Sequence, residues 1–519
     1  MFSERQSIRR WLLGALLAGA LVRLPGVAWG VNWPDGFTIH HPDEYTHIAN
    51  ADAIISPLGP ATGVAYPKAF AAYAATPFLV WYGLNGSFGG PRIHLPWIVG
   101  SGRLISVAFG LAAILLVFLI GRDALHHEEA GVLAAWLMAF AGLHVSQSHF
   151  FLADTAAIGW TLLAVWLLWR DVTHGPTDEA LRWAAFAAGA ALAVKIFVDV
   201  LPAVLYVALR RPPRVRRLIH VAVFLLAAFA TASLGFETPA TFYRAAKLGA
   251  GNPLEFSHVR ATVLAAIQLP ALLSLPLLLL ALAGTWSLLR RLAASAEPRR
   301  LDALTIFGSV PLIGLAFITL KLDPWIRHWL ILVPWAAIAG GWALARLVGW
   351  IRQTGRSPAF ALLAVFGWMA VFVVDGERFY LFDPRNDALR WLHANVPAGT
   401  TMNWMGRRTP EGYQTVRWFT EGKPDVLIFE MYEANQSLSG TDWRDSYPSD
   451  PNQVYDGRTR ERVAAIQSLF RGTSDYTMVA RFPVPYLMPE YRLADALLGD
   501  RARNYISEIV VFRRSPDSR

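Results

Sequence analysis

Two short acidic segments carry the residue types that catalysis most often uses. The first, "IHHPDEYTHIANAD", brings Asp43 and Glu44 together among histidines, and the second, "SQSHFFLADTAAIGW", holds His149 and Asp154. Carboxylates can act as general bases and, together with histidine, can bind a divalent metal ion. Asp43, Glu44 and Asp154 are therefore candidate catalytic residues, and these three with His149 are candidate metal ligands.

Each segment also has a purely structural interpretation. Pro42 followed by two acids is an ordinary helix start, because the helix dipole favours acidic side chains there. Asp154 lies inside an apolar segment, where a carboxylate is costly, and this favours a functional role. The alternative for Asp154 is snorkelling to the surface or an ion pair with a nearby arginine.

Cations form a second group of candidates. Of the 47 Lys and Arg residues only five are lysines, and the topology below places Lys68, Lys195, Lys247 and Lys321 on the outer side. An ammonium is a compact point charge that suits a phosphate. The alternative is that these four lysines fall on the outer side by chance. The predicted donor-phosphate ligands are the cations at outer loops and span ends: Lys68, Lys195, Arg103, Arg327 and His328.

The elements that must position these residues are membrane spans. The chain of 519 residues is 54% hydrophobic and 16% charged, and its mean hydropathy is +0.35. In a soluble domain about a quarter of the residues are charged. This composition therefore excludes a soluble enzyme, a disordered chain and a fibrous protein. Cysteine is absent, which excludes disulfides, thiolate metal sites and a cysteine nucleophile.

The apolar segments predict a series of helices, since roughly 20 residues cross a bilayer core. The segment 181–209 is best explained as a hairpin of two short helices with its apex near Lys195–Asp199, although a re-entrant loop would give the same sidedness. Counting the hairpin as two gives about 11 spans. The other candidate spans are residues 10–29, 97–121, 130–147, 150–169, 218–236, 261–289, 303–320, 327–349 and 358–374.

Arginine sets the predicted orientation. The clusters at 5–10, 210–217, 290–300 and 346–356 mark cytoplasmic loops by the positive-inside rule. The N-terminus is then inside, and an odd number of spans leaves residues 376–519 outside. Basic and acidic residues are equal in number from Gly376 onward, so the whole +9 excess lies in residues 1–375. The basic pI therefore indicates membrane topology rather than nucleic-acid binding. A cleaved signal peptide over residues 1–30 is the less favoured alternative.

The predicted fold is a polytopic α-helical membrane protein, N-in and C-out, with a long first outer loop over residues 30–96. Residues 1–375 form the transmembrane catalytic domain, and residues 376–519 form an extracytoplasmic α/β domain. Within the latter, a helix is expected over 385–395 and strands over 424–432 and 505–514.

Several motifs, taken in their order along the chain, resemble those of the GT-C superfamily of polytopic glycosyltransferases. The most similar branch is that of the protein O-mannosyltransferases and the lipid A aminoarabinose transferases. The motifs are "HPDEYTHIANA", "YPKAFAAYA", "GRLISVAFGLAAILLVFLIGR", "SHFFLADT", "ALAVKIFVDVLPAVL", "IRHWLILVPWAAIAGGWAL" and "NDALRWLHANVPAG". The resemblance covers nearly the whole chain.

The resemblance implies transfer of a sugar from a polyprenyl-phosphate donor to an extracytoplasmic hydroxyl or phosphate, usually with inversion. Asp43 would be the base, with Glu44 and Asp154 assisting it or binding a metal. The acceptor would be a lipid, glycan or protein, and the site would be the inner membrane of a bacterial cell with the C-terminal domain in the periplasm. This sequence departs from the family at His328, where a tyrosine is common. It also departs at Lys68, which follows the single Pro67, whereas the aminoarabinose transferases carry a lysine ahead of a proline pair.

Two functions of other classes remain open. A transporter or lipid flippase would also carry intramembrane charge, although such proteins usually place their sites near the midplane. A membrane-anchored binding protein would use residues 376–519 as its active part.

Overall fold

The fold is taken from a computed structural model. It describes residues 5–30, 42–55, 69–85, 95–174, 178–195, 268–293, 326–405, 409–431, 458–498 and 508–516, with the single positions 308, 311, 312, 315 and 434. The chain forms two compact units, one of Met1–Trp29 with His41–Glu377 and one of Gly30–His40 with Arg378–Arg519. Each unit is described by itself.

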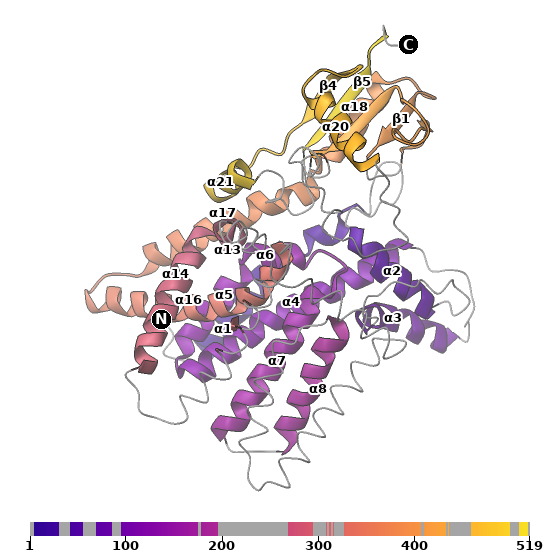
Figure 1. The fold of residues 1–519 in the computed structure, drawn as a ribbon. Coiled ribbons are helices and arrows are strands. Elements are labelled where there is room, and N and C mark those ends of the chain that lie inside the picture. Colours follow the sequence, from indigo (N-terminus) through magenta and orange to yellow (C-terminus); the bar gives the residue numbers. More distant parts are fainter. Residues whose placement is uncertain are drawn as a thin grey trace. The chain divides into compact units, whose positions relative to one another are not determined.

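The first unit is helical (Figure 1). Its longest helix is α4, which contains no charged residue between Arg103 and Arg122. The described elements are α1 (Arg5–Arg23), η1 (Pro25–Ala28), α2 (Pro42–Ile55), α3 (Ala69–Asn85), α4 (Leu95–Leu125), α5 (Glu128–Ala139), α6 (Gly142–Gln147), α7 (Ala153–His174), α8 (Asp178–Val194), α13 (Leu269–Leu273), α14 (Leu275–Ala293), η2 (Ile326–Leu332), α16 (Val333–Gln353) and α17 (Ala359–Leu381).

The composition and length of these helices identify a multi-pass membrane protein. Within the described ranges, four helical stretches are long and apolar enough to cross a bilayer: Gln6–Ala28, Pro96–Leu125, Arg327–Gln353 and Ala359–Asn395. Large apolar side chains on α1 are exposed at four-residue intervals, at Leu13, Leu17 and Leu21. Such a stripe is expected of a helix whose outer face meets lipid. The larger number of spans expected from the sequence stays a prediction, because spans 218–236 and 303–320 lie mostly or wholly outside the described residues.

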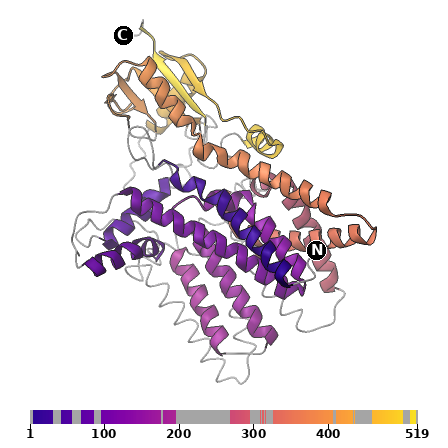
Figure 2. The same cartoon turned by 180° about the vertical axis from the view of Figure 1, so that it is seen from behind.

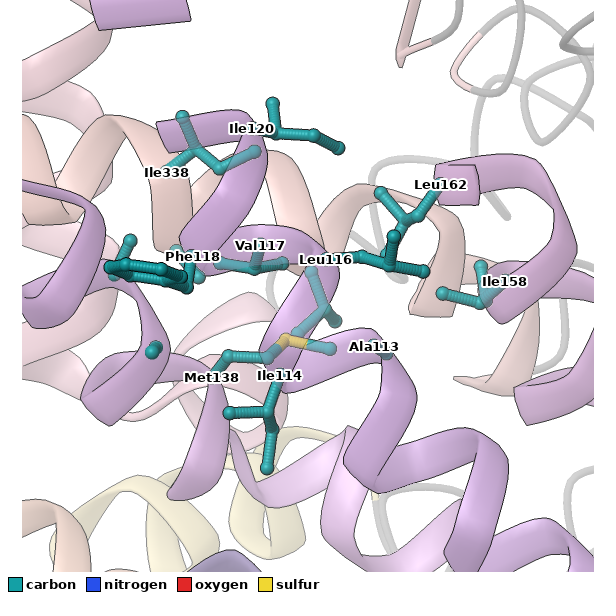
Figure 3. Packing of buried hydrophobic residues seen from close by; sticks show 14 of the residues in the cluster. Ala113, Ile114, Leu116, Val117, Phe118, Ile120, Met138, Ile158, Leu162 and Ile338 are labelled. Carbon is teal, nitrogen blue, oxygen red and sulfur yellow. The ribbon is translucent and has the colours of Figure 1, made fainter. Parts of the chain in front are cut away.

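The core of this unit forms around α4. Its buried residues Ile114, Val117 and Phe118 belong to one cluster with Met138 of α5 and Leu162 of α7 (Figure 3). Helix α4 contacts α1, α5, α7 and α16, and α16 in turn packs on α14 (Figure 2). The alanine-rich faces of α5 and α16 bring their backbones close, as is usual for helices in membranes. Helix α4 is therefore the central element of this unit, against which the neighbouring helices pack.

Two predicted spans are interrupted, and the predicted first outer loop contains helices. Span 130–147 is divided into α5 and α6 at Phe140 and Ala141. In the described part of span 261–289, Ser274 adopts a positive φ of 74° between α13 and α14. Helices α2 and α3 lie within residues 30–96. A hydropathy pattern reports apolar length alone, so it does not detect one residue that leaves the helical conformation.

The second unit contains a five-stranded sheet in the order β2-β1-β3-β5-β4. Strand β1 pairs in parallel with β2 and β3, whereas β5 is antiparallel to β3 and β4. The elements are α18 (Pro384–Asn395), β1 (Thr401–Trp404), β2 (Gln414–Thr415), β3 (Val426–Glu430), α20 (Arg458–Phe470), β4 (Tyr476–Phe482), α21 (Pro489–Leu498) and β5 (Ile509–Arg514).

Helix α18 begins as its sequence predicts. Asp383 caps it by accepting a hydrogen bond from the backbone of Arg385, and Pro384 occupies its first position. Helix α18 packs its Leu389 and Leu392 against Ile428 of β3. The helix expected over 385–395 and the strands expected over 424–432 and 505–514 are thus confirmed as α18, β3 and β5.

Candidate functional site

Glu44 in the first turn of α2 is joined to Arg103 of α4. The guanidinium donates from Nε to Oε1 and from Nη2 to Oε2, both at 2.9 Å, and both side chains are completely buried. Arg103 also donates to the backbone carbonyls of Val27 and Trp29. A forked pair of this kind fixes both partners in orientation. Arg103 thus connects α4, the first turn of α2 and the segment after α1.

The same carboxylate also reaches the second acidic segment. The backbone N–H of Phe151 donates to Glu44 Oε1 at 2.7 Å. On the other side, Ser106 of α4 donates to the carbonyl of Phe150 at 2.7 Å. Glu44 and Ser106 therefore hold residues 150–151, the segment that leads directly into α7. The two acidic segments of the sequence meet here.

Two glycines make this close packing possible. A Cβ on Gly102 would lie 2.3 Å from the ring of Phe151, and a Cβ on Gly26 would lie 2.0 Å from Nδ1 of His149. Neither position has room for a side chain. The aromatic rings of the second acidic segment therefore lie directly on the backbones of α4 and η1.

Asp154 lies in the first turn of α7, almost completely buried, and forms an ion pair with Lys195 just after the end of α8. Helices α7 and α8 pack along one another, which brings residues 41 positions apart in sequence together (Figure 1). The side chain of Lys195 is 23% exposed and that of Asp154 only 4%. The side chain of Lys195 is thus the more accessible partner of this ion pair.

His149 does not join the carboxylates of Glu44 and Asp154 in a metal cluster but pairs through Nε2 with Glu377 near the end of α17. Glu377 was not among the candidate residues, although an acid shortly after an apolar span is a usable signal in the sequence. Arg23 was not among the residues singled out from the sequence either. Arg23 is completely buried and donates to the carbonyls of Met138 and Ala139, where α5 ends.

Arg327 and His328 lie in η2, which contacts α6 and α7. His328 is buried, and Arg327 is partly exposed. Lys68 lies outside the described residues. The backbone of Asp43 lies in the first turn of α2, next to Glu44, but its side chain is outside the described part. In the part of the chain that the structure describes, there is no group of three or more His, Cys, Asp or Glu that could hold a metal ion.

Residues 82–210 match the family model described as dolichyl-phosphate-mannose-protein mannosyltransferase. The matched segment carries Arg103, His149, Asp154 and Lys195, whereas Asp43 precedes it. A search of curated proteins finds no match.

Solved structures resemble the chain over nearly its whole length. The oligosaccharyltransferase of Archaeoglobus fulgidus in its apo form is 12% identical, with a TM-score of 0.52, over 99% of this chain and 89% of that one. The same enzyme, AglB, in complex with an inhibitory peptide and a dolichol-phosphate, has a TM-score of 0.50 at 12% identity, over 99% and 89% of the two chains. ArnT from Cupriavidus metallidurans, bound to undecaprenyl phosphate, is 14% identical with a TM-score of 0.47, over 96% and 98%. The family model and the shared fold together confirm the resemblance to the GT-C membrane glycosyltransferases that the motifs indicated.

Proposed function

We propose that this protein transfers a sugar from a polyprenyl-phosphate-linked donor to a hydroxyl or phosphate of an acceptor outside the cytoplasm. The observation that carries the proposal is the contact of Glu44 with both Arg103 and the backbone of Phe151. It ties the first turn of α2, which carries Asp43, to the segment that enters α7 and carries Asp154. Two acids from distant parts of the sequence thereby belong to one end of one helical unit.

In the proposed reaction Asp43 is the general base. Its carboxylate removes the proton of an acceptor hydroxyl, the acceptor oxygen forms a bond to the anomeric carbon, and the bond from that carbon to the phosphate oxygen breaks. The electron pair of the broken bond leaves with the polyprenyl phosphate. Attack from the side opposite the phosphate inverts the anomeric centre. Glu44 acts as a positioning residue, because both of its oxygens already accept hydrogen bonds.

The cations near Asp154 stabilise the leaving phosphate. Asp154 holds the ammonium of Lys195 beside the entry of α7, and η2 brings Arg327 and His328 to the same helix. Fixed positive charge at a developing phosphate lowers the barrier, since it needs no reorganisation during the reaction. Lys68 is a further candidate for this role. The A. fulgidus enzyme has been solved with a dolichol-phosphate, a ligand of the class proposed here.

The described acids are not arranged as a metal site. Glu44 is engaged by Arg103 and Asp154 by Lys195, so a divalent ion would have to displace one of these cations. The reaction written above moves its proton through Asp43 and balances the phosphate charge with side chains. The A. fulgidus oligosaccharyltransferase has been solved in complex with zinc and sulfate, so the metal dependence of transfer by this protein should be measured directly.

The charge distribution supports the proposed orientation. Arg122 and Arg352 lie near the ends of α4 and α16, and Arg170 lies near the end of α7. Each of these three helices starts at the end of the unit where Asp154 lies and finishes at the opposite end. By the positive-inside rule the arginine end is cytoplasmic, so the acids face outward. We assign the protein to the inner membrane of a bacterial cell, with residues 1–375 as the catalytic domain and residues 376–519 in the periplasm.

Lipids that copurify with the intact protein test the donor class. Mass spectrometry of the extracted lipids should find a polyprenyl-phosphate sugar with the wild type, and less of it with Lys195→Ala. Recovery of other membrane lipids without any polyprenyl phosphate would contradict the proposal. A transporter remains the second candidate, and solvent access to Asp154 alternately from both sides of the membrane would favour it.

A further inference from the structure

Helix α17 presents a continuous apolar stripe to its surroundings. The exposed large side chains are Phe360, Leu363, Val371, Val374 and Leu381. Their successive spacings of three, eight, three and seven residues place them on one face of the helix. Because this helix is a candidate membrane span, the stripe is the face that meets lipid.

The stripe is as long as a bilayer core is thick. From Phe360 to Leu381 a helix rises about 32 Å, against a hydrocarbon core of about 30 Å. Arg356 precedes the stripe, and Arg378 lies one turn before its end. Leu381 and the next residue, Phe382, which are 54% and 74% exposed, therefore mark the level at which the chain leaves the outer leaflet.

The last turn of α17 belongs to the second unit, and there it contacts the segment that leads into α21. Arg378 donates to the carbonyl of Pro485, and the ring of Phe379 lies 5.3 Å from that of Tyr486 in an edge-on arrangement. Tyr486 in turn lies 4.8 Å from Tyr491 within α21. These contacts fix the start of α21 to the level of Phe379 on α17.

Two leucines are among the exposed residues of this segment. Leu487 is 61% exposed and Leu493 is 54% exposed, whereas Glu490 and Ala494 on the other face of α21 are buried. Arg492 is exposed as well and donates to the carbonyl of Tyr486 at 2.7 Å. Exposed leucines beside tyrosine and arginine are a combination that suits the interface between membrane and water.

We infer that residues 486–493 lie in the interfacial layer of the outer leaflet, with Leu487, Leu493 and Phe382 inserted among lipids. Tyrosine rings prefer this layer because one end of the ring is apolar and the other is polar. Arginine side chains there can extend toward the lipid headgroups. The occupant of the apolar surface is thus the bilayer itself, because the lipid-facing stripe of α17 ends at the same level. The inference rests on the orientation proposed above, but not on the catalytic roles of the acids.

The absence of cysteine makes a direct test simple. Leu487→Cys and Leu493→Cys in the full-length chain would each carry one nitroxide label after reconstitution into vesicles of phosphatidylethanolamine and phosphatidylglycerol. Arg390→Cys on α18 and Arg417→Cys serve as controls, because these side chains are exposed on the same unit. Power saturation then compares collisions of the label with oxygen, which concentrates in lipid, and with a water-soluble nickel chelate.

The inference predicts that the oxygen-to-nickel collision ratio at positions 487 and 493 is several-fold higher than at positions 390 and 417. Equal ratios at all four positions would overturn it. Low collision rates with both reagents at 487 and 493 would also overturn it, since they would show that protein covers the segment. Leu487→Ser and Leu493→Ser give a second readout: the double variant should leave α21 more accessible to a soluble protease in vesicles, and unchanged cleavage would count against the inference.

Discussion

The two ends of the helical unit carry their charges in different ways. At the arginine end, Arg352 pairs with Glu129 at 2.8 Å while the side chains remain 34% and 15% exposed. At the opposite end, Arg103 and Glu44 are completely buried and each contacts backbone atoms as well as the other. Charges at the first end suit the boundary between membrane and water. Charges at the second end hold separate segments of the chain together.

This difference has an energetic consequence. A partly exposed ion pair contributes about 0–1 kcal/mol, because water already solvates both groups well. Removing one partner of a buried pair costs about 3–5 kcal/mol, because the other charge is left buried and uncompensated. Substitutions at the two ends should therefore differ sharply, even where they remove the same kind of side chain.

The largest effect on stability is expected for Arg103→Met. It leaves the Glu44 carboxylate buried without its partner and should lower the free energy of unfolding by about 3–5 kcal/mol. Transfer activity should fall with it, because the first turn of α2 loses its attachment. Thermal unfolding of the purified protein in nanodiscs measures the first effect. A melting temperature equal to that of the wild type would refute the structural role given to this pair.

The next effect concerns the donor. Lys195→Ala should lower kcat/KM for the polyprenyl-phosphate donor about 10- to 100-fold, since a hydrogen bond to a charged group contributes about 1.5–3 kcal/mol. Lys195→Arg keeps the charge and should recover part of the loss. Steady-state kinetics of both variants give the comparison. If Lys195→Ala kept wild-type kcat/KM, Lys195 would serve only to balance Asp154.

A smaller effect is expected for Gly102→Ala. The added Cβ would lie 2.3 Å from the ring of Phe151, so the second acidic segment must shift, at a cost of about 1–3 kcal/mol. Gly349→Ala in α16 is the matched control, because no heavy atom lies within 4 Å of its Cβ. The control should be neutral or slightly stabilising. Equal melting temperatures for the two variants would argue against the tight packing of Phe151 on α4.

The smallest effect is expected for Arg352→Met at the arginine end. Its pair with Glu129 is partly exposed, so stability should change by no more than about 1 kcal/mol and transfer should be retained. The same unfolding and transfer assays as for Arg103→Met apply. A loss as large as that at Arg103 would remove the distinction between the two ends.

The sequence predicted what depends on local pattern. Apolar length located α4, α7, α16 and α17, and the shorter helical and apolar segments after residue 376 indicated α18, β3 and β5. The scarcity of charge in an apolar chain also directed attention to Asp154 and Lys195, and these two residues form an ion pair. Local composition contains enough information for these features, because each depends on neighbours within a few turns.

The contacts between distant segments could not be predicted in the same way. Glu44 and Arg103 are 59 positions apart, and their pairing depends on how α2 folds back onto α4. Arg103 was expected among the phosphate ligands, and the structure shows its contacts with Glu44 and with the backbone of the segment after α1. The pairing of His149 with Glu377 depends equally on the position of α17. Residue type and spacing identified the participants, and tertiary packing determines which of them meet.

The most direct test of the central claim compares Asp43→Asn with Asp154→Asn, each expressed at the wild-type level. The purified variants are reconstituted with the polyprenyl-phosphate sugar extracted from the wild type, and isolated membranes supply the acceptor. Release of polyprenyl phosphate is followed by mass spectrometry. Loss of the general base should reduce the rate about 100- to 10,000-fold for Asp43→Asn, and loss of the Lys195 partner should also impair Asp154→Asn. Full transfer by both variants would contradict the claim that the two acids share one catalytic site.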